Sequence, residues 1–545
     1  MLWIKSCSLS ALQEKQPLPI RSSLPKTRNS KGTTKHCAHT ALKMSAWGKN
    51  GSARSCDALL KRVEQNDPRL SELIILPLKR FGSNELFRLS KALESGINTN
   101  LKSLQASGHA IDDVRALEAL GRGLSKIESI AIGDSETSDA GVCAFCQGME
   151  SNPKRNDGSI ALKSVDLSYK NIGKDGLRAV LKVFANLPSL EYLDLSRNEQ
   201  FGPSFQFWEE TSSLSLSTPI LANLTHLDLS SCGLDAKSCS TLLKAMDGNE
   251  NDNNARDLVL KLNSNDLSDR EGLKEMMSIL SKGTLVTELF LSRCQIGDEG
   301  LEIMVDECCS GQNTSNNGSL QRLDLSHNNL SSVSPLAKQL HPRPDNTSSS
   351  NPYHYFSGLE KLDLTGNPLG SNLLSSIESN PEWILSLQEL DLSHTSCDVY
   401  GAMELIRSCN TKKSSLKKLN LFGNGLGSNG FLALSDILHG GHLSLEYLDL
   451  GGNGAEESAV VVLVMALGKF LEDDSDQEIV PKGESTLQVL VVGANKGGPA
   501  LEKAIKDVQK VHPSLDIARD KVKKKNEGMP GGNMFNSTPG TSWMA

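Results

Sequence analysis

The stretch LEYLDLSRN at residues 190–198 decides the fold, because the same nine-residue pattern returns along most of the chain. Its clearest copies are LTHLDLSSC at 224–232, LQRLDLSHN at 320–328, LEKLDLTGN at 359–367, LQELDLSHT at 387–395, LKKLNLFGN at 416–424 and LEYLDLGGN at 445–453. Apolar residues occupy positions four and six of each copy, between positions three, five and seven. This alternation has the period of two that is typical of a β-strand with one buried face.

The pattern continues in both directions and defines an internal repeat. Further copies start at 162, 257, 286 and 487, and weaker ones start at 70, 101 and 127. We count fourteen units between about 70 and 510, spaced by 28 or 29 residues where insertions are fewest. Segments with helical periodicity, such as 175–187 and 298–309, lie between the strands. Strand, crossover helix and parallel strand together predict a right-handed β-α unit.

These fourteen units resemble the leucine-rich repeat, and their period resembles its ribonuclease-inhibitor type. The resemblance implies an α/β solenoid shaped like a horseshoe, with a parallel β-sheet on the concave face and α-helices on the convex face. We expect the leucines at positions four and six to be buried; examples are Leu193, Leu195, Leu227, Leu229, Leu323 and Leu325. At position nine, where Cys232 and Cys294 replace the usual Asn, the side chain is expected to bond backbone groups at the turn.

Composition divides the chain into three parts. Residues 1–55 are predicted to be a disordered, Ser/Thr-rich arm with ten basic residues and one acidic residue. An organelle transit peptide, or a true start at Met44, are the alternatives for this arm. Residues 56–512 form the predicted repeat domain, capped by helices at 56–70 and 498–512. Residues 513–545 are predicted to be a basic, then Gly/Pro/Ser-rich, disordered tail.

Insertions separate several helices from the strands that follow them. They are rich in Asn, Ser, Gly, Pro and Asp and lie at 151–159, 247–254, 311–319, 341–358 and 472–485. We expect flexible surface loops there. Two interpretations are open: drift at sites where insertion is tolerated, or a binding edge on one flank of the solenoid.

Composition and charge also limit the function. Aromatic residues make up only 4% of the chain, which favours a core packed mainly with leucine over several conventional cores. Residues 1–55 carry a net charge of +9, whereas the other 490 carry 47 basic and 64 acidic side chains, a net charge of −17. This acidic body argues against nucleic-acid binding and fits binding to proteins.

The predicted location follows from what the sequence lacks. No apolar run approaches the roughly 18–20 residues that cross a bilayer, and residues 1–15 contain no sustained hydrophobic segment. The twelve cysteines are scattered, which favours free thiols in a reducing compartment. We therefore expect a monomeric, cytoplasmic protein without membrane contact, with nuclear or organelle targeting by residues 1–55 as the alternative.

Two short motifs could suggest chemistry, but the repeat explains both. Gly425, Gly427 and Gly430 match G-x-G-x-x-G, yet residues 170–177 occupy the same turn of another repeat. Cys143 and Cys146 form one C-x-x-C without the second pair that a structural zinc site needs. We predict no catalytic, cofactor-binding or metal-binding residues, and no enzymatic activity.

The concave face is the candidate binding site. Seven of the ten well-formed repeats have Asp at position five, which should produce an acidic row across adjacent strands. Asp is also frequent there in leucine-rich repeats generally, so the row could be repeat consensus. Aromatic side chains at positions three and five could anchor a partner. We predict these partner-binding residues: Tyr192, Asp194, Asp228, Phe290, Asp324, Asp363, Asp391, Tyr447 and Asp449.

Three functions are consistent with this sequence. The first is a non-enzymatic scaffold that holds a protein partner, a basic one in particular, on its concave face. The second is regulation of a Ran-type GTPase, because LSRCQIGDEGL at 291–301 resembles Ran GTPase-activating proteins. Those proteins typically end in an acidic tail, whereas residues 521–525 are KVKKK, so no catalytic residue is assigned. The third is actin-filament regulation, because NDPRL at 66–70 is similar to the start of the tropomodulin repeat domain, whose array is much shorter.

Overall fold

The computed structural model divides the chain into two units, Met1–Arg54 and Ser55–Ala545. It describes only residues of the second unit, namely 55–154, 160–202, 223–247, 257–282, 286–310, 320–340, 355–409, 414–440, 444–469 and 486–519. Nearly all of the predicted arm, the tail after residue 519 and most of the five predicted insertions therefore lie outside the described residues.

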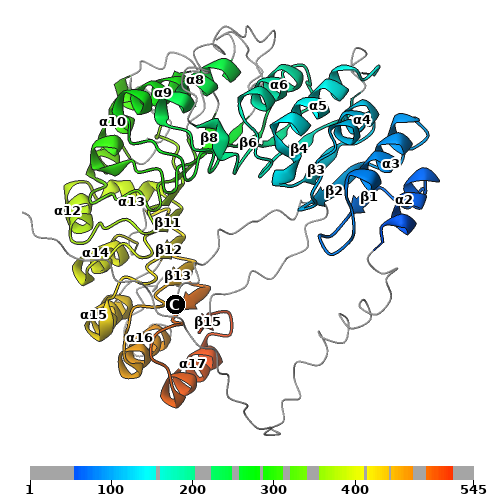
Figure 1. Ribbon diagram of the computed structural model, residues 1–545. Helices are drawn as coiled ribbons and strands as arrows, with labels where there is room; N and C mark the ends of the chain where they lie inside the picture. The colour runs from blue at the N-terminus through cyan, green and yellow to red at the C-terminus, as the bar shows by residue number, and fades with distance from the viewer. Residues whose placement is uncertain are drawn as a thin grey trace, which may run out of the picture. The chain divides into compact units, whose positions relative to one another are not determined.

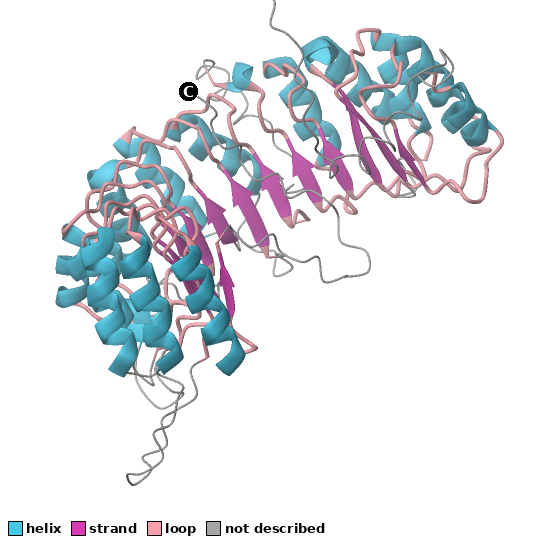
Figure 2. Cartoon of the chain, turned by 90° about the horizontal axis from the view of Figure 1, so that it is seen from below, coloured by secondary structure: helices cyan, strands magenta, loops and turns pink. Residues whose placement is uncertain are grey.

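One parallel sheet runs through the described residues, and Figure 2 shows its strands side by side. Its fifteen strands follow one another in chain order, from β1 at one edge to β15 at the other. They are β1 (Glu72–Ile74), β2 (Ser103–Ser107), β3 (Ser129–Gly133), β4 (Ser164–Asp166), β5 (Tyr192–Asp194), β6 (His226–Asp228), β7 (Leu258–Lys261), β8 (Val286–Phe290), β9 (Arg322–Asp324), β10 (Lys361–Asp363), β11 (Glu389–Asp391), β12 (Lys418–Asn420), β13 (Tyr447–Asp449), β14 (Val489–Val491) and β15 (Asp516–Ala518).

Helices cover the convex face of this sheet, as Figure 1 shows. They are α2 (Asp57–Glu64), α3 (Ser83–Glu94), α4 (Val114–Gly123), α5 (Ser138–Glu150), α6 (Lys174–Phe184), α8 (Ala236–Asp247), α9 (Arg270–Lys282), α10 (Gly297–Ser310), α11 (Ser334–Ala337), α12 (Asn372–Ser379), α13 (Glu382–Ser386), α14 (Val399–Cys409), α15 (Gly427–Gly440), α16 (Glu457–Lys469) and α17 (Pro499–Val511). Short 3₁₀ turns lie at Ser135–Thr137 and Glu199–Phe201. A helix lies within the predicted 56–70 segment, but α2 ends at Glu64, before the predicted end; it buries Leu60 and Val63.

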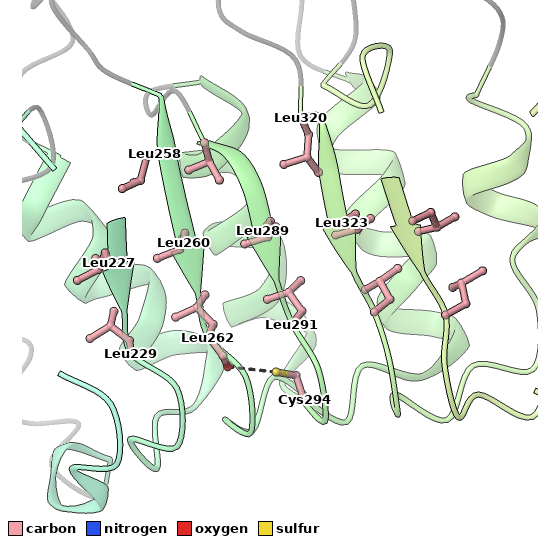
Figure 3. Packing of buried hydrophobic residues seen from close by; sticks show 14 of the residues in the cluster. Leu227, Leu229, Leu258, Leu260, Leu262, Leu289, Leu291, Cys294, Leu320 and Leu323 are labelled. Carbon is pink, nitrogen blue, oxygen red and sulfur yellow. Dashed lines mark hydrogen bonds between the residues drawn. The ribbon is translucent and has the colours of Figure 1, made fainter. Parts of the chain in front are cut away.

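The hydrophobic core lies between the sheet and the helices. The six leucines chosen from positions four and six are all between 0% and 1% exposed, as predicted. Figure 3 shows several of these side chains pointing to the same side of the strands, so that each repeat packs on the next. Complete burial of one leucine stabilises a fold by roughly 1.5–3 kcal/mol, so this repeated pair contributes substantially to the stability of each unit.

The ladder of backbone hydrogen bonds continues beyond the three-residue strands. Leu195 N donates to Asp228 O at 2.8 Å, and Arg197 N donates to Ser230 O at 2.8 Å. The residue at position eight, such as Arg197 or His327, has φ near +60°. This left-handed residue turns the chain away from the sheet while its N–H still bonds the next repeat.

Position nine closes the turn through its side chain. Asn328 Nδ2 donates to Leu291 O at 2.7 Å, and Asn328 Oδ1 accepts from Cys294 N at 2.8 Å. Cys294 Sγ donates to Leu262 O at 3.3 Å, the dashed contact in Figure 3. Cys232 Sγ likewise donates to Leu195 O at 3.2 Å. The predicted structural role of these two cysteines is confirmed.

The predicted number of strands was one too few. All fourteen predicted units contain a strand, but β15 follows α17, which was expected to end the repeat domain at residue 512. Its segment lacks the full nine-residue pattern. Only Leu515 and Ile517, which are 4% and 6% exposed, supply the buried alternation, and they are enough to pair with β14.

Candidate protein-binding face

The strands present positions three and five on the face opposite the helices. In β10, for example, Leu362 is buried whereas Lys361 and Asp363 are partly exposed. The register aligns equivalent positions of neighbouring repeats, so Asp363 pairs with Asp324 on one side and with Asp391 on the other. We call Asp324, Asp363 and Asp391 the second aspartate triplet.

A first aspartate triplet lies earlier on the same face. It consists of Asp166, Asp194 and Asp228, which are in register on β4, β5 and β6. Adjacent strands in a sheet are about 4.8 Å apart, so each triplet stacks three carboxylates closely. The acidic row predicted from the sequence is thus split into two triplets by β7 and β8.

One oxygen of each aspartate has a structural task. Asp363 Oδ1 accepts a hydrogen bond from Thr365 N, and Asp194 Oδ1 accepts one from Ser196 N, both at 2.9 Å. The other four triplet aspartates accept the same bond, from Ser168 N, Ser230 N, Ser326 N and Ser393 N. Such side-chain turns fix the backbone where the strand ends. They explain why Asp recurs at position five, and they leave the second oxygen for other contacts.

The central aspartate of each triplet has the least favourable surroundings for a charge. Burial, reinforced by the charges of Asp228 and Asp166, raises the pKa of Asp194 to about 6. Burial, with Asp391 and Asp324 adding to it, raises the pKa of Asp363 to about 6. Both causes penalise the ionised form. Each triplet therefore concentrates negative charge whose repulsion the fold does not fully relieve.

One outer aspartate of each triplet, Asp228 or Asp391, has a side-chain partner on the next strand. Asp228 Oδ2 lies 3.7 Å from Lys261 Nζ. Asp391 Oδ2 accepts a hydrogen bond of 2.7 Å from Asn420 Nδ2.

Phe290 separates the two triplets, and cations lie close to its ring. Arg322 Cζ is 4.8 Å and Lys261 Nζ 5.9 Å from the ring centroid. Arg322 also lies 3.9 Å from a carboxylate oxygen of Glu288. Cations at these distances are attracted by the aromatic face. Phe290 is partly exposed, and we interpret it as an apolar contact point between two acidic surfaces.

The other two aromatic residues predicted for this face lie near its ends. The Tyr192 ring is 5.7 Å from the ring of His226, which is exposed. Tyr447 donates a hydrogen bond from its hydroxyl to Asp449 Oδ2 at 3.2 Å. Asp449 is only 1% exposed, unlike the other eight predicted residues, which are partly exposed. Asp449 therefore contributes to the turn after β13 and not to an accessible surface.

Position eight carries a row of side chains that was not predicted to bind a partner. Arg197, Arg293, His327 and His394 are exposed and left-handed, just after the strands end. Burial, together with the nearby charge of Arg293, lowers the pKa of the His327 imidazole and favours its neutral form. A substituent on Gly366 would lie 2.3 Å from His327 Nδ1, so the imidazole covers that glycine. The repeated basic residue at this position was a signal that a reading of positions three, five and seven overlooks.

The glycine motif and the C-x-x-C motif both have structural positions in their repeats. Gly425 and Gly427 have φ of +70° and +63° and form the turn into α15, and Cys143 and Cys146 lie on α5. Among the described residues, no three His, Cys, Asp or Glu side chains are placed to hold a metal ion. The ten cysteines in the same part of the chain are free thiols. No helix in the described ranges is long and apolar enough to span a bilayer.

Comparisons with known proteins agree with this architecture. Family models described as leucine-rich repeats match residues 221–243, 284–302, 319–338 and 412–435. Ribonuclease inhibitor of Mus musculus is 24% identical over 373 residues, covering 64% of this chain and 75% of its own length. Rho GTPase-activating protein gacW of Dictyostelium discoideum is 21% identical over 453 residues, covering 78% of this chain and 38% of its own length.

Further matches are more partial. NACHT, LRR and PYD domains-containing protein 3 of Homo sapiens is 27% identical over 298 residues, 48% of this chain. The chain spans between 25% and 38% of the length of the first three curated relatives it matches. A TLR13–ssRNA13 complex aligns with a TM-score of 0.35 and 16% identity over 72% of this chain and 44% of that one. The actin-binding site 2 of leiomodin-1 aligns with a TM-score of 0.22 and 17% identity over 35% of this chain and 87% of that one.

Proposed function

Because the chain is a leucine-rich repeat protein of the ribonuclease-inhibitor type, we propose that it is a non-enzymatic scaffold whose concave face binds a basic segment of a protein partner. The pair of aspartate triplets carries this proposal. Each triplet stacks three carboxylates in register, and each central carboxylate has a pKa raised to about 6 by burial and by its neighbours. Perturbed ionisable groups of this kind concentrate at functional sites.

A basic partner would relieve the repulsion within each triplet. Lysine or arginine side chains placed beside Asp194 and Asp363 would favour the ionised carboxylates, and that gain is made only in the complex. Phe290 lies between the triplets with Arg322 and Lys261 beside its ring, so its contribution to a partner would be an apolar contact with a side-chain stem. The strands hold these groups rigidly, so little ordering entropy is lost on binding.

The two alternative functions rest on less. GTPase regulation is supported by residues 291–301 and by the name of one relative that is 21% identical. Actin regulation is supported by residues 66–70 alone. No arrangement of the described side chains favours either over the scaffold.

Photocrosslinking in living cells tests whether the concave face binds the partner. A benzophenone amino acid replaces Tyr192 or Phe290 in the full chain, and a control places it at Tyr400, which is 69% exposed on α14 of the convex side. We expect positions 192 and 290 to crosslink to the same protein, and position 400 not to do so. Crosslinking of that protein only from position 400 would contradict the proposal.

A further inference from the structure

A row of basic side chains runs beside the second aspartate triplet. It consists of Arg322, Lys361 and Lys418 at position three of β9, β10 and β12, and we call it the basic row. The register aligns Arg322 with Lys361, and Lys361 with Glu389, which holds position three of β11. Two residues of a strand span about 6.6 Å, so the basic row and the triplet are two parallel rows of opposite charge.

The ion pairs of the basic row run along it and not across to the triplet. Lys418 Nζ lies 2.7 Å and Lys361 Nζ 3.6 Å from Glu389 Oε1. Burial alone would raise the pKa of Glu389, but Lys418 and Lys361 lower it, so this carboxylate is ionised at neutral pH. Among the described residues, no ion pair joins the basic row to an aspartate of the second triplet. The three basic residues and Glu389 therefore leave a net positive charge, and between 41% and 51% of each basic side chain is exposed.

The first aspartate triplet has different neighbours. Position three of β4, β5 and β6 carries Ser164, Tyr192 and His226. Burial, with the charge of Lys261 adding to it, lowers the pKa of His226, so its imidazole is mainly neutral at pH 7. The first triplet thus lies beside uncharged side chains, whereas the second lies beside the basic row. The two triplets therefore suit different parts of a partner.

The backbone of these strands limits the conformation of a ligand on β9 to β12. Each of the four strands pairs with a neighbouring strand on both sides. A segment that lies on them must therefore satisfy its own backbone groups, as an α-helix does. A helix that crosses the strands advances about 5.4 Å per turn, close to the spacing of about 4.8 Å between strands. About one helical turn would lie over each repeat.

A helix also contacts both charged rows at once. Residues three or four apart share one edge of a helix, so one edge can follow the second triplet while the adjacent edge follows the basic row. An extended segment crossing the strands turns every second side chain away from the sheet, and those on one face are about 6.6 Å apart. It would offer a single line of side chains with a spacing that differs from that of the strands.

We propose that β9 to β12 bind an α-helix of the protein partner that has two charged edges. Basic residues along one edge face the second aspartate triplet, and acidic residues along the adjacent edge face the basic row. This inference rests on the proposed function and specifies the part of the partner that lies on these four strands. A purely basic segment is repelled there by Lys361 and Lys418, whereas a helix with two charged edges is attracted by both rows.

Helical peptides test this proposal on the full chain. A two-edged peptide carries Lys at positions i, i+4, i+7 and i+11 and Glu along the adjacent edge, and a charge-mixed isomer has the same composition with both charges on both edges. Fluorescence anisotropy gives the dissociation constants. We expect the two-edged peptide to bind at least tenfold more tightly than its isomer, and to lose at least tenfold in affinity for a Lys361→Gln/Lys418→Gln variant.

An arginine-rich peptide should respond in the opposite direction. It should bind the Lys361→Gln/Lys418→Gln variant more tightly than the unmodified chain, because the substitutions remove repulsion beside the second triplet. A Lys503→Gln/Lys506→Gln variant removes the same charge from two exposed positions on α17 and is the matched control. It should bind both peptides as the unmodified chain does.

Three results would overturn the proposal. Equal affinities of the two-edged peptide and its isomer would mean that the arrangement of the charges is not recognised. An unchanged affinity for the Lys361→Gln/Lys418→Gln variant would exclude the basic row from the contact. A central proline that leaves the affinity of the two-edged peptide unchanged would exclude a helix. Failure of the proposed function gives a different result, because the arginine-rich peptide would then bind an Asp194→Asn/Asp363→Asn variant as tightly as the unmodified chain. Circular dichroism checks that the variants are folded and that the two peptides are equally helical.

Discussion

Asp363 and Asp391 lie in register on adjacent parallel strands, and each gives one carboxylate oxygen to the backbone N–H two residues ahead. The same carboxylate thus serves the turn and the open face. This double use separates two effects that mutation usually mixes, because Asn preserves the turn bond while it removes the charge. The chain already contains that substitution: Asn420 Oδ1 accepts a hydrogen bond of 3.0 Å from Phe422 N at the equivalent turn.

Replacing Asp363 with Asn should therefore stabilise the repeat unit at neutral pH. The pKa of Asp363 is raised from 3.8 to about 6, so its contribution to stability is fully present below about pH 4 and is lost as pH rises through about 6. Asp363→Asn removes this loss, and we expect a gain of about 1–2 kcal/mol at pH 7 and no gain near pH 4. Urea denaturation at both pH values measures it. Asp363→Ala should instead be less stable than Asp363→Asn, because it also loses the bond to Thr365 N; equal stability of the two variants would refute the role given to the turn.

Removing the side chain of Asn328 at position nine should lower the stability of the fold more than removing an exposed amide side chain does. Asn328 is fully buried, donates to Leu291 O and accepts from Cys294 N. Asn328→Ala leaves both backbone groups without a partner, so the free energy of unfolding should fall by about 2–4 kcal/mol. Gln321→Ala, at an exposed position of the same repeat, is the matched control and should change the free energy of unfolding by less than about 0.5 kcal/mol. Comparable losses of stability in the two variants would mean that the side-chain hydrogen bonds of Asn328 do not stabilise the repeat.

Gly366 should be coupled to His327. Gly366 has φ of +71°, and an added Cβ would lie 2.3 Å from His327 Nδ1. Gly366→Ala should cost about 1–3 kcal/mol of stability, from backbone strain and from displacement of the imidazole. In a double-mutant cycle, His327→Ala should remove the part of this stability loss that comes from the contact with the imidazole. The part that comes from backbone strain should remain. Additive effects would mean that the imidazole does not cover the glycine in solution.

The fold could be predicted from the sequence in unusual detail, and particular residues show why. Leu193 and Leu195 are buried because a period of two admits only one buried face, and that period is written in the sequence. Strand β15 was not predicted because its segment lacks the nine-residue pattern. It pairs with β14 through its backbone, and Leu515 and Ile517 are buried. Local pattern alone does not reveal such an end effect.

The placement of the aspartates on one face could be predicted from the sequence, but their individual surroundings could not; partner binding there stays a prediction. The row of aspartates follows from register, yet nothing in the spacing distinguishes Asp449, which is buried and bonded by the Tyr447 hydroxyl, from Asp194, which remains partly exposed. That difference depends on which neighbouring side chains cover each carboxylate. The split of the row likewise depends on Lys261 and Phe290, whose effect on the surface appears only when their contacts with Arg322 and Asp228 are known.

Binding of a basic partner to the concave face should weaken as the solution becomes acidic. Protonation of Asp194 and Asp363, whose pKa values are about 6, removes negative charge between pH 7.5 and 5. We expect the affinity for an arginine-rich peptide to fall by about tenfold over this range. An Asp194→Asn/Asp363→Asn variant should show weaker binding with a flatter pH profile. A profile unchanged by the double substitution would assign the pH dependence to other groups.

The salt dependence of peptide binding by this double variant decides whether a basic partner binds at the aspartate triplets. The dissociation constant of an arginine-rich peptide is measured from 50 to 500 mM NaCl for the unmodified chain, for Asp194→Asn/Asp363→Asn, and for Glu302→Gln/Asp306→Asn, which removes two charges from exposed positions on α10. We expect only the substitutions at Asp194 and Asp363 to weaken binding at 50 mM NaCl, by about tenfold, and to reduce the sensitivity of binding to salt. Equal losses for the two double variants would mean that net charge alone attracts the peptide, and would contradict binding at the aspartate triplets.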